Sequence, residues 1–410
     1  MEWVRLRDIG KIVTGNTPPT SKPEFYGDYM PFIKATDISL DSKTTLVTEQ
    51  SYSKRASEKY KESLVPKGST CVVTIGSIGK KMTYAHKDLF VNQAINAIIP
   101  SPKYDNEYIY YNVKYSVLPQ LKKLDSGTTS GRENVSKSSF SNIRIPIVKD
   151  KNIQHRIASI LSTYDSLIEN NTKRIRLLEK MAENLYKEWF VRFRFPGHEN
   201  VEMENGLPKG WKVMHIKDIA TLKSGFAFKS EWFVSEGCGV AKIKDIGETF
   251  MDLSNLSYVC EDNCKKAQRF ILKEGMLTIA LTGATIGKIS IVPKHSTCIY
   301  TNQRLGKFFV ENQPIDSLPF LYCLFSQESM VQDIINLANS SSAQPNISPE
   351  QINNIKFTCD EKIIDKYNQM LKGYFQIMID LHCQNSLLAR QRDLLLPRLM
   401  SGKLEVKVKA

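Results

Sequence analysis

A glycine-rich turn carrying a lysine is the first feature of this 410-residue chain that could do chemistry. Residues 283–288 read Gly-Ala-Thr-Ile-Gly-Lys, which is similar to a phosphate-binding loop. The loop is one residue short, and Ile289 stands where a Ser or Thr would hold magnesium. The matching segment 76–80 is shorter still. We therefore expect a repeated turn that presents a lysine, and no ATP site.

A second motif is similar to the Pro-Pro core of amino-methyltransferases. Residues 16–19 read Asn-Thr-Pro-Pro, but Thr20 follows where that core has an aromatic residue. No glycine-rich fingerprint of the dinucleotide type accompanies the motif. Nothing in the chain is therefore expected to hold S-adenosylmethionine.

Residue types that build nucleophilic and metal centres are scattered. None of the six histidines lies in a His-Glu-x-x-His or nucleophile-elbow context. Among eight cysteines only Cys260 and Cys264 are close, without a second Cys or His pair at zinc-ligand spacing. We interpret them as reduced cytosolic thiols and expect no catalytic residue, metal or cofactor in this chain.

The chain is basic, with 56 Lys and Arg against 43 Asp and Glu, a formal charge of +13 and a pI of about 9.2. This balance favours a polyanionic partner, although a merely soluble basic protein has the same composition. The N-terminus has no apolar signal region, and no run of 18 apolar residues occurs. We expect a cytoplasmic protein with no membrane segment.

The elements that position any site come from an internal duplication at an offset of about 210 residues. The matches are Trp3 and Trp211, Asp8-Ile9 and Asp218-Ile219, Gly15 and Gly225, 32–38 and 240–246, Gly79-Lys80 and Gly287-Lys288, Asn92-Gln93 and Asn302-Gln303, and 132–136 and 344–348. Chance is a poor explanation for so many matches in one order. Each copy alternates short strand patterns with Gly, Pro and Asn turns and a few helices, which predicts an α+β domain.

After each copy comes a segment nearly free of Gly and Pro, with apolar residues on a seven-residue repeat. At 1.5 Å per residue these helices would span roughly 55 Å and 50 Å, too long to be buried in either domain. We expect them to pair as an antiparallel coiled coil. The predicted interface is Ile153, Ile157, Ile160, Tyr164, Leu167, Asn171, Leu178 and Leu185 in the first, and Ile363, Tyr367, Met370, Tyr374, Ile377, Leu381, Leu388 and Leu395 in the second.

The expected fold class is therefore α+β, with two repeated mixed α/β domains separated by two long helices. The predicted segments are 1–150 (first domain), 151–195 (first helical spacer), 196–209 (linker), 210–357 (second domain) and 358–405 (second helical spacer). Asn171 lies on the seam, where a buried polar residue can fix the register. A solvated position for Asn171 is an equal alternative.

Several motifs give the whole chain a resemblance to the specificity subunits of type I restriction-modification systems. They are Thr14-Gly15-Asn16-Thr17-Pro18-Pro19, Gly79-Lys80, Asn92-Gln93, Ser130-Gly131-Arg132, 185–190 (Leu-Tyr-Lys-Glu-Trp-Phe) and 395–402 (Leu-Leu-Pro-Arg-Leu-Met-Ser-Gly). The last two are the more specific. The second copy departs from the pattern at 224–228, which lacks the Thr-Pro.

This resemblance implies a DNA-binding subunit that is not an enzyme by itself. Each repeated domain would recognise one half-site of a bipartite duplex target, and the helices would set the unread spacer. The implied partners are two modification subunits, which bind S-adenosylmethionine and methylate adenine, and two restriction subunits, which use ATP and Mg²⁺ for translocation and cleavage.

Candidate DNA-binding residues are those whose side chains suit base edges or phosphates. They are Lys34, Thr36, Lys80, Lys81, Asn92, Gln93, Ser130 and Arg132 in the first domain, and Lys242, Lys244, Lys288, Asn302, Gln303, Arg304, Ser342 and Gln344 in the second. A solvated or turn-capping role is an equal alternative for each. Two rival functions are a coiled-coil scaffold that binds protein partners, and a self-contained methyltransferase or nuclease, whose motifs this chain lacks.

Overall fold

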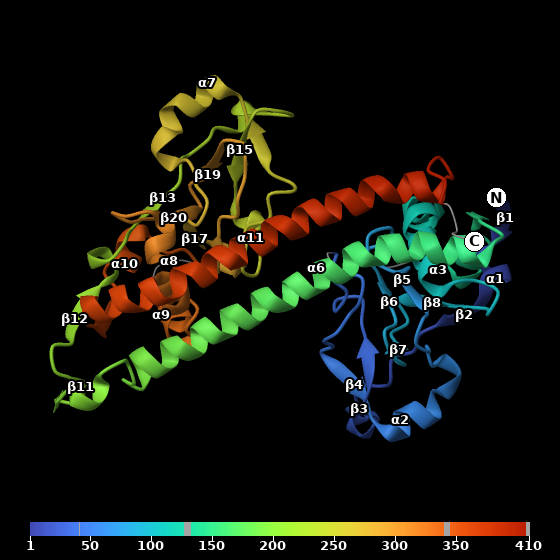
Figure 1. The fold of residues 1–410 in the computed structure, drawn as a ribbon, viewed down its shortest axis with the longest axis horizontal. Coiled ribbons are helices and arrows are strands. Elements are labelled where there is room, and N and C mark those ends of the chain that lie inside the picture. The colour runs from blue at the N-terminus through green and yellow to red at the C-terminus, as the bar shows by residue number, and fades with distance from the viewer. Residues whose placement is uncertain (41, 127–132, 340–344, 407–410) are drawn as a thin grey trace. The chain divides into compact units, whose positions relative to one another are not determined.

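The computed structural model describes residues 1–40, 42–126, 133–339 and 345–406. It divides into two compact units, one made of Met1–Asn170 with Ser386–Ala410 and the other of Asn171–Asn385. Each unit contains one copy of the repeated α+β domain and a stretch of each long helix (Figure 1).

In the first unit a four-stranded antiparallel sheet has the order β2-β8-β5-β6 and a three-stranded sheet has the order β4-β3-β7. The bounds are β2 Gly10–Thr14, β8 Ile95–Pro100, β5 Thr70–Val73, β6 Met82–Tyr84, β4 Gln50–Tyr52, β3 Tyr26–Ile33 and β7 Phe90–Val91. A separate pair joins β1 Glu2–Arg5 to β9 Arg144–Ile147. The helices are α1 Leu6–Ile9, α2 Lys54–Lys59, α3 Asn106–Asn112, α4 Leu118–Leu121 and α5 Lys137–Ser141.

The second unit repeats this strand order. Its sheets are β13-β20-β17-β18 and β14-β16-β15-β19, and β12 Lys212–His215 pairs with β21 Lys356–Cys359. The bounds are β13 Thr221–Ser224, β20 Leu305–Phe309, β17 Leu277–Ala280, β18 Ile289–Ile291, β14 Phe233–Val234, β16 Ser257–Val259, β15 Cys238–Ala241 and β19 Ile299–Thr301. The helices are α7 Glu261–Cys264, α8 Pro314–Phe325, α9 Glu328–Asn339 and α10 Pro349–Asn353. The predicted duplication is therefore present in the strand topology.

Burial explains why the central strands form. All four residues of β5, and all four of β17, are buried, and most are apolar or β-branched. A turn with glycine at positive φ precedes each strand, at Gly68 and Gly275. Helices α3 and α8 add aromatic side chains to the apolar clusters of their units. Each domain thus has a core of its own.

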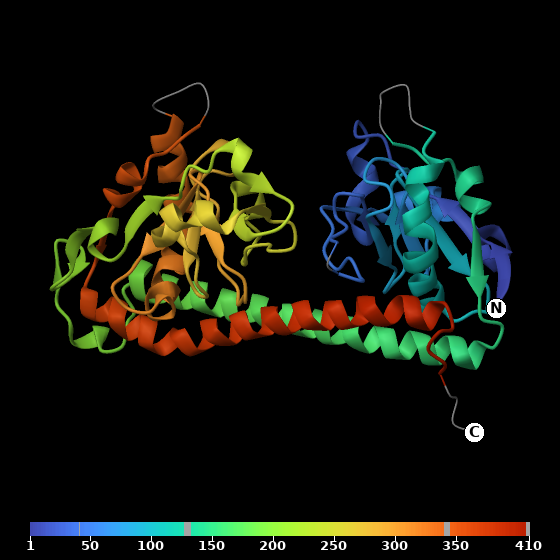
Figure 2. The same ribbon diagram turned by 90° about the horizontal axis from the view of Figure 1, so that it is seen from above.

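Two long helices, α6 Lys151–Tyr186 and α11 Glu361–Met400, run antiparallel (Figures 1 and 2). In the first unit the start of α6 packs with the end of α11, so that Leu161 and Leu399 share one apolar cluster. In the second unit the end of α6 packs with the start of α11, and Ala182 and Tyr367 share another. The predicted fold class, α+β domains with an antiparallel helix pair, is confirmed.

Part of the predicted helix seam is wrong. Leu167, Met370, Tyr374 and Ile377 are 45%, 51%, 39% and 41% exposed. The buried positions on α6 also include Leu161, Ile168, Ile175 and Ala182, which were not predicted, and those on α11 include Leu371, Phe375 and Met378. This face of each helix is buried because the helix packs on its own domain as well as on the other helix. A seven-residue pattern alone does not choose between adjacent faces.

The other seam positions are buried or partly buried. Ile157, Asn171, Ile363, Tyr367 and Leu381 are buried, and Ile153, Ile160, Tyr164, Leu178, Leu185, Leu388 and Leu395 are partly buried. Asn171 is 7% exposed, and its Nδ2 donates to Gln384 Oε1 at 3.4 Å. Asn385 Nδ2 donates to Thr172 Oγ1 at 3.2 Å in the neighbouring turn. Of the two alternatives for Asn171, the structure supports the buried one.

The segment expected to be a linker contains a small hairpin of its own. Strands β10 Met203–Glu204 and β11 Leu207–Pro208 pair antiparallel. Asn205 and Gly206 between them have φ of 51° and 80°, as the two central residues of a tight hairpin turn require.

Candidate nucleic-acid interface

The same capped turn follows a central strand in both domains. The backbone N–H of Lys34 donates to Asp37 Oδ2 at 2.8 Å, and that of Lys242 donates to Asp245 Oδ2 at 2.8 Å. These turns begin directly after β3 and β15. An aspartate that accepts from the backbone three residues earlier stabilises a turn. The sequence match of 32–38 with 240–246 therefore has a structural cause.

A second turn lies beside the first because their strands pair in parallel. Ile33 pairs with Val91 in β3 and β7, and the Asn92 N–H donates to the Ile33 carbonyl at 3.0 Å. In the other domain the Asn302 N–H donates to the Ala241 carbonyl at 2.9 Å. The carboxyl ends of parallel strands meet at one edge of a sheet. Each domain thus presents two neighbouring turns there.

The two asparagines of the second turn have a structural role. Asn92 Oδ1 accepts from the Ala94 N–H at 3.3 Å, and Asn302 Oδ1 accepts from the Arg304 N–H at 3.4 Å. Both side chains are partly buried. The turn-capping alternative is therefore supported for both. The next residue, Gln93 or Gln303, is exposed.

Both copies have a glycine near the start, and the close approach of another backbone segment explains it. A Cβ at Gly15 would lie 2.0 Å from the Val91 carbonyl oxygen, and one at Gly225 would lie 2.3 Å from the Thr301 carbonyl oxygen. Only glycine fits at such positions. The segment that begins at each glycine therefore packs directly against the backbone that leads into the second turn.

The strand pairing changes the match between the lysines. Val73 N donates to the Lys81 carbonyl and Ala280 N to the Lys288 carbonyl, so Lys81, not Lys80, is the counterpart of Lys288. Lys81 Nζ donates to the Ala35 carbonyl at 3.0 Å, and Lys288 Nζ donates to the Ile246 carbonyl at 3.4 Å. Both lysines thus connect the first turn to the four-stranded sheet by a hydrogen bond.

The candidate residues fall into three groups. The exposed ones are Thr36, Lys80, Gln93, Lys244, Lys288, Gln303 and Arg304, and the partly buried ones are Lys34, Lys81, Asn92, Lys242 and Asn302. Ser130, Arg132, Ser342 and Gln344 lie outside the described residues. The chain next to those segments reaches the glycine-rich turns, since the Gly76 N–H donates to the Glu133 carbonyl at 2.9 Å and the Gly283 N–H to the Pro345 carbonyl at 3.1 Å.

Two further candidate lysines, besides Lys81 and Lys288, have partners within the protein. Lys34 Nζ lies 2.5 Å from Glu49 Oε2. Lys244 Nζ donates to the Asn255 carbonyl at 2.8 Å and lies 3.5 Å from Asp245 Oδ1. The partner Glu49 is 66% exposed, whereas Asp245 is only 5% exposed, so the Lys34 pair is the one that an external anion could replace more readily.

Cations around an aromatic ring extend the interface of the first domain, and the sequence analysis missed them. Lys22 Nζ, Arg55 Cζ and Lys59 Nζ lie 5.9, 5.9 and 4.8 Å from the centroid of the Phe25 ring. None of the three forms an ion pair within the described part of the chain. Phe25 belongs to a small aromatic cluster with Tyr52, whose hydroxyl donates to the Asn16 carbonyl at 2.7 Å. The cations therefore adjoin the glycine turn.

The second domain also places cations over aromatic rings, here over three separate rings, and Lys229 lies 3.8 Å from Glu231 Oε1 as well. Lys229 Nζ lies 5.6 Å from the Trp232 ring, Arg269 Cζ lies 4.9 Å from the Phe270 ring, and Lys242 Nζ lies 3.9 Å from the Phe233 ring. Burial and the neighbouring Lys244 lower the pKa of Lys242. Lys22 and Lys229 each precede a 3-10 helix, Pro23–Phe25 or Ser230–Trp232. A lysine three residues before an aromatic in both copies is the signal that could have identified them.

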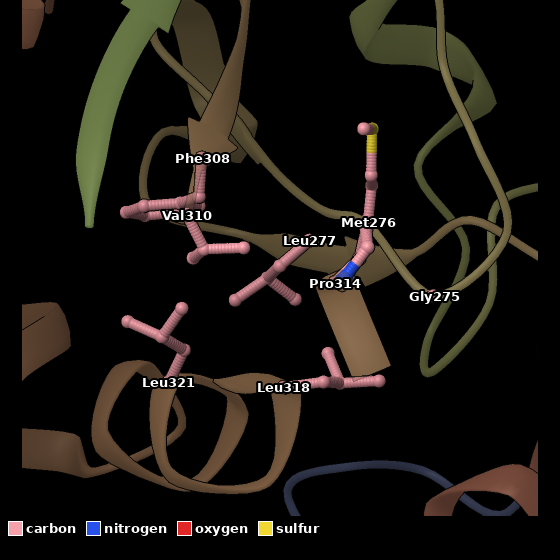
Figure 3. A pocket seen from close by; sticks show the side chains of 8 residues that line it. All are labelled: Gly275, Met276, Leu277, Phe308, Val310, Pro314, Leu318 and Leu321. Carbon is pink, nitrogen blue, oxygen red and sulfur yellow. The ribbon is translucent and has the colours of Figure 1, made fainter. Parts of the chain in front are cut away.

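Residues 283–288 differ in their surroundings from a phosphate-binding loop. Residues 283–288 continue into strand β18 and not into a helix, so they lack the helix N-terminus that a phosphate-binding loop uses. A pocket in the second unit between β17 and α8 has a volume of about 10 Å³, close to one water molecule, and apolar walls such as Leu277 and Leu321 (Figure 3). Across the described residues, no three or more His, Cys, Asp or Glu side chains are placed to hold a metal ion.

An apolar groove lies between α6 and α11 in the second unit. It has a volume of about 620 Å³, and its walls include Leu177, Met181, Leu185, Met370 and Tyr374. Leu177 is 68% exposed. Among the described helices, none is long and apolar enough to cross a membrane. A contiguous exposed apolar stretch on a helix pair is typical of a protein-binding surface.

Comparison with known families supplies an independent finding. Residues 1–180 and 208–359 match the family described as the type I restriction modification DNA specificity domain. The chain is 25% identical over 414 residues to the MjaIX type I restriction enzyme specificity subunit of Methanocaldococcus jannaschii, an alignment that covers 98% of this chain and 93% of that one. The MjaVIII specificity subunit of the same organism is 26% identical over 413 residues, with 99% and 93% covered.

A solved structure shares the fold. The type I restriction-modification S subunit from M. genitalium superposes with a TM-score of 0.59 at 20% identity, covering 97% of this chain and 96% of that one. The likeness therefore extends over both repeats and both long helices.

Proposed function

The chain belongs to the type I restriction modification DNA specificity domain family, and from this premise we propose that it is the DNA-reading subunit of a type I restriction-modification enzyme in the cytoplasm. The domains at 1–150 and 210–357 each read one half-site of a bipartite duplex. The helical segments 151–195 and 358–405, joined to the second domain through 196–209, set the unread spacer. The family favours this function over a scaffold that binds only proteins.

One observation carries the proposal: the same pair of turns occurs twice, at the same strand ends. Lys34–Asp37 lies beside Asn92, and Lys242–Asp245 lies beside Asn302. Two half-sites on one duplex can each be met by a domain of the same build, which presents its own side chains to its own base pairs. The turns are rich in the amide, hydroxyl and cationic side chains that bind base edges in the major groove.

The structural roles of the candidates divide them into readers and supports. Thr36, Gln93, Gln303 and Arg304 are exposed on the turns, and we assign base contacts to them. The residues that cap or tie the turns, such as Lys81, hold the readers in place. We assign phosphate contacts to the cations over aromatic rings. These cations lie beside the turns, and a contact with a phosphate does not depend on the base sequence. These phosphate contacts are Lys22, Arg55, Lys59, Lys229 and Arg269.

Chemistry then belongs to the partners. Two modification subunits, carrying S-adenosylmethionine, methylate adenine, and two restriction subunits use ATP and Mg²⁺. We assign the groove at Leu177, Met181 and Met370 to one modification subunit. The exposed Leu167, Leu387 and Leu394 on the same helices, within the first unit, form the surface for the other. Exposed leucine and methionine on a helix pair suit a helical partner.

Exchange of one domain tests the function. Residues 211–357 are replaced by the matching segment of a relative with another target, and adenine methylation is mapped by single-molecule sequencing in cells that also express the modification subunit. One half-site should change and the other should stay, because base discrimination of about 1–3 kcal/mol per bidentate contact is local to the domain that makes it. The reciprocal exchange of 1–150 is the matched control. A continuous motif, or a change in both half-sites at once, would refute the bipartite reading.

A further inference from the structure

Two hydroxyl groups of the first domain bind carboxylates on α6. Thr44 Oγ1 donates to Glu169 Oε1 at 2.7 Å, and the Tyr111 hydroxyl donates to Asp165 Oδ2 at 2.5 Å. Tyr111 is fully buried, and the Asp165 side chain is 4% exposed. Hydrogen bonds to an ionised, buried carboxylate are short and directional. They therefore fix an angle as well as a distance.

The second domain binds α6 through the same two residue types. Thr249 Oγ1 donates to Glu179, at 3.2 and 3.4 Å from its two carboxylate oxygens, and the Tyr322 hydroxyl donates to Glu179 Oε1. Tyr322 is 4% exposed. A single carboxylate here serves both donors.

The donors lie on corresponding elements of the two repeats, although the two threonines are one position apart: the Tyr84 N–H donates to the Lys43 carbonyl, and the Ile291 N–H donates to the Thr249 carbonyl. Tyr111 lies on α3 and Tyr322 on α8, the helices that follow the β8 and β20 strands. Thr44 lies in the loop that leaves the Lys34–Asp37 turn, and Thr249 in the loop that leaves the Lys242–Asp245 turn. Each candidate reading turn is thus followed in the sequence by a threonine that donates a hydrogen bond to α6. The family match does not identify these residues.

We propose that these hydroxyl–carboxylate pairs are positioning contacts, which hold each recognition domain at one angle on α6 and so restrict the spacer length at which its turns meet the DNA. This inference rests on the proposed function. A domain held by packing alone can tilt on the helix, because apolar contacts are not directional. Two hydroxyl–carboxylate hydrogen bonds from each domain remove that freedom in advance, which favours a single DNA geometry.

A purely structural role predicts a different result. Loss of stability lowers the amount of folded protein and leaves the ratio of affinities for two DNA molecules unchanged. Loss of a positioning contact changes the ratio between spacer lengths and leaves the ratio between base sequences unchanged. The test therefore compares ratios and not single affinities.

The variant T249V/Y322F removes both donors with little change in shape, and T249S is the matched control that keeps the hydroxyl. The full chain is assembled with its modification subunit, and affinities are measured for duplexes with the target spacer and with spacers one base pair shorter and longer. A fourth duplex has the target spacer and one altered base in the second half-site. We expect the preference of T249V/Y322F for the target spacer to fall by at least about tenfold, because the loss of a single hydrogen bond to a charged group is already worth about that factor. T249S should keep the wild-type spacer preference, and the single-base discrimination should stay as in the wild type.

An unchanged spacer preference in T249V/Y322F, with a spacer-dependent wild type, overturns the inference and leaves the proposed function in place. Absence of duplex binding by the wild-type complex contradicts the proposed function itself. If the double variant does not fold, the single variant T249V is compared with T249S in the same way. Equal spacer preferences in that pair overturn the inference as well.

Discussion

Replacement of Arg392 by Met would remove the cation of a buried ionic network in the first unit. The Arg392 guanidinium lies 2.5 Å from Asp165 Oδ1, and 2.9 and 3.1 Å from the two oxygens of Asp393. The exposed fractions decide the outcome: the side chains of Arg392 and Asp165 are 11% and 4% exposed, whereas Asp393 is 52% exposed. Asp393 can regain water after the substitution, and Asp165 cannot.

The magnitudes differ for the two partners. After R392M, Asp165 keeps the Tyr111 hydroxyl but no cation, and an uncompensated buried charge costs about 3–5 kcal/mol. After D165N, Arg392 still has Asp393, so the loss is one charge-assisted hydrogen bond, about 1.5–3 kcal/mol. In R392M/D165N the neutral amide needs no cation. We therefore expect the double variant to be more stable than R392M alone.

Urea unfolding at pH 7 measures this cycle, with the midpoint and slope recorded for the wild type and the three variants. Arg390→Met, an exposed position two residues earlier on another face of α11, is the control and should stay close to the wild type. Strictly additive losses in the double variant, or a larger loss in D165N than in R392M, would refute the reasoning about which charge is stranded.

Three further results are expected. The triple variant K22A/R55A/K59A should weaken DNA binding equally on all sequences. It should also make the slope of log K against log salt less steep by about 2.7, because each lost phosphate contact contributes about 0.9. K103A/K149A is the control, and a loss of affinity confined to the target sequence would contradict the assignment. Insertion of seven residues in both α6 and α11 should add about 10.5 Å and lengthen the spacer by about three base pairs, with both half-sites unchanged in the methylation map; an unaltered spacer in an active variant would remove the helices from this role. The His382 ring stacks on Phe250 at 4.3 Å, and burial lowers the pKa of His382, although Asp252 acts in the opposite direction. The unfolded state therefore binds the proton more tightly than the folded state. The contribution of His382 to the free energy of unfolding is complete above pH 6.5 and is lost as the pH falls below it. The urea midpoint should thus fall less between pH 7.5 and 5.5 in H382Q than in the wild type, and equal falls would contradict the assignment.

Local patterns in the sequence were enough to predict the duplication, both long helices and the family. The strand order of the two sheets repeats because the apolar runs and turn residues repeat, and each of those signals acts within a few residues. The Lys34–Asp37 turn is an example, since its aspartate caps the backbone three residues earlier. Asn92 and Gln93 could also be placed on a turn from sequence, and a structural role in that turn could be suggested for Asn92 in particular.

The tertiary structure alone decided which face of each helix is buried and which side chains gather at the turns. Met370 and Tyr374 follow the seven-residue repeat and are nevertheless exposed, because the packing of α11 on its own domain buries an adjacent face of the helix. The approach of Gly15 to Val91 and the bond from Thr44 to Glu169 join residues far apart in the chain. Such contacts depend on the path of the whole domain, and periodicity along the chain carries no information about that path.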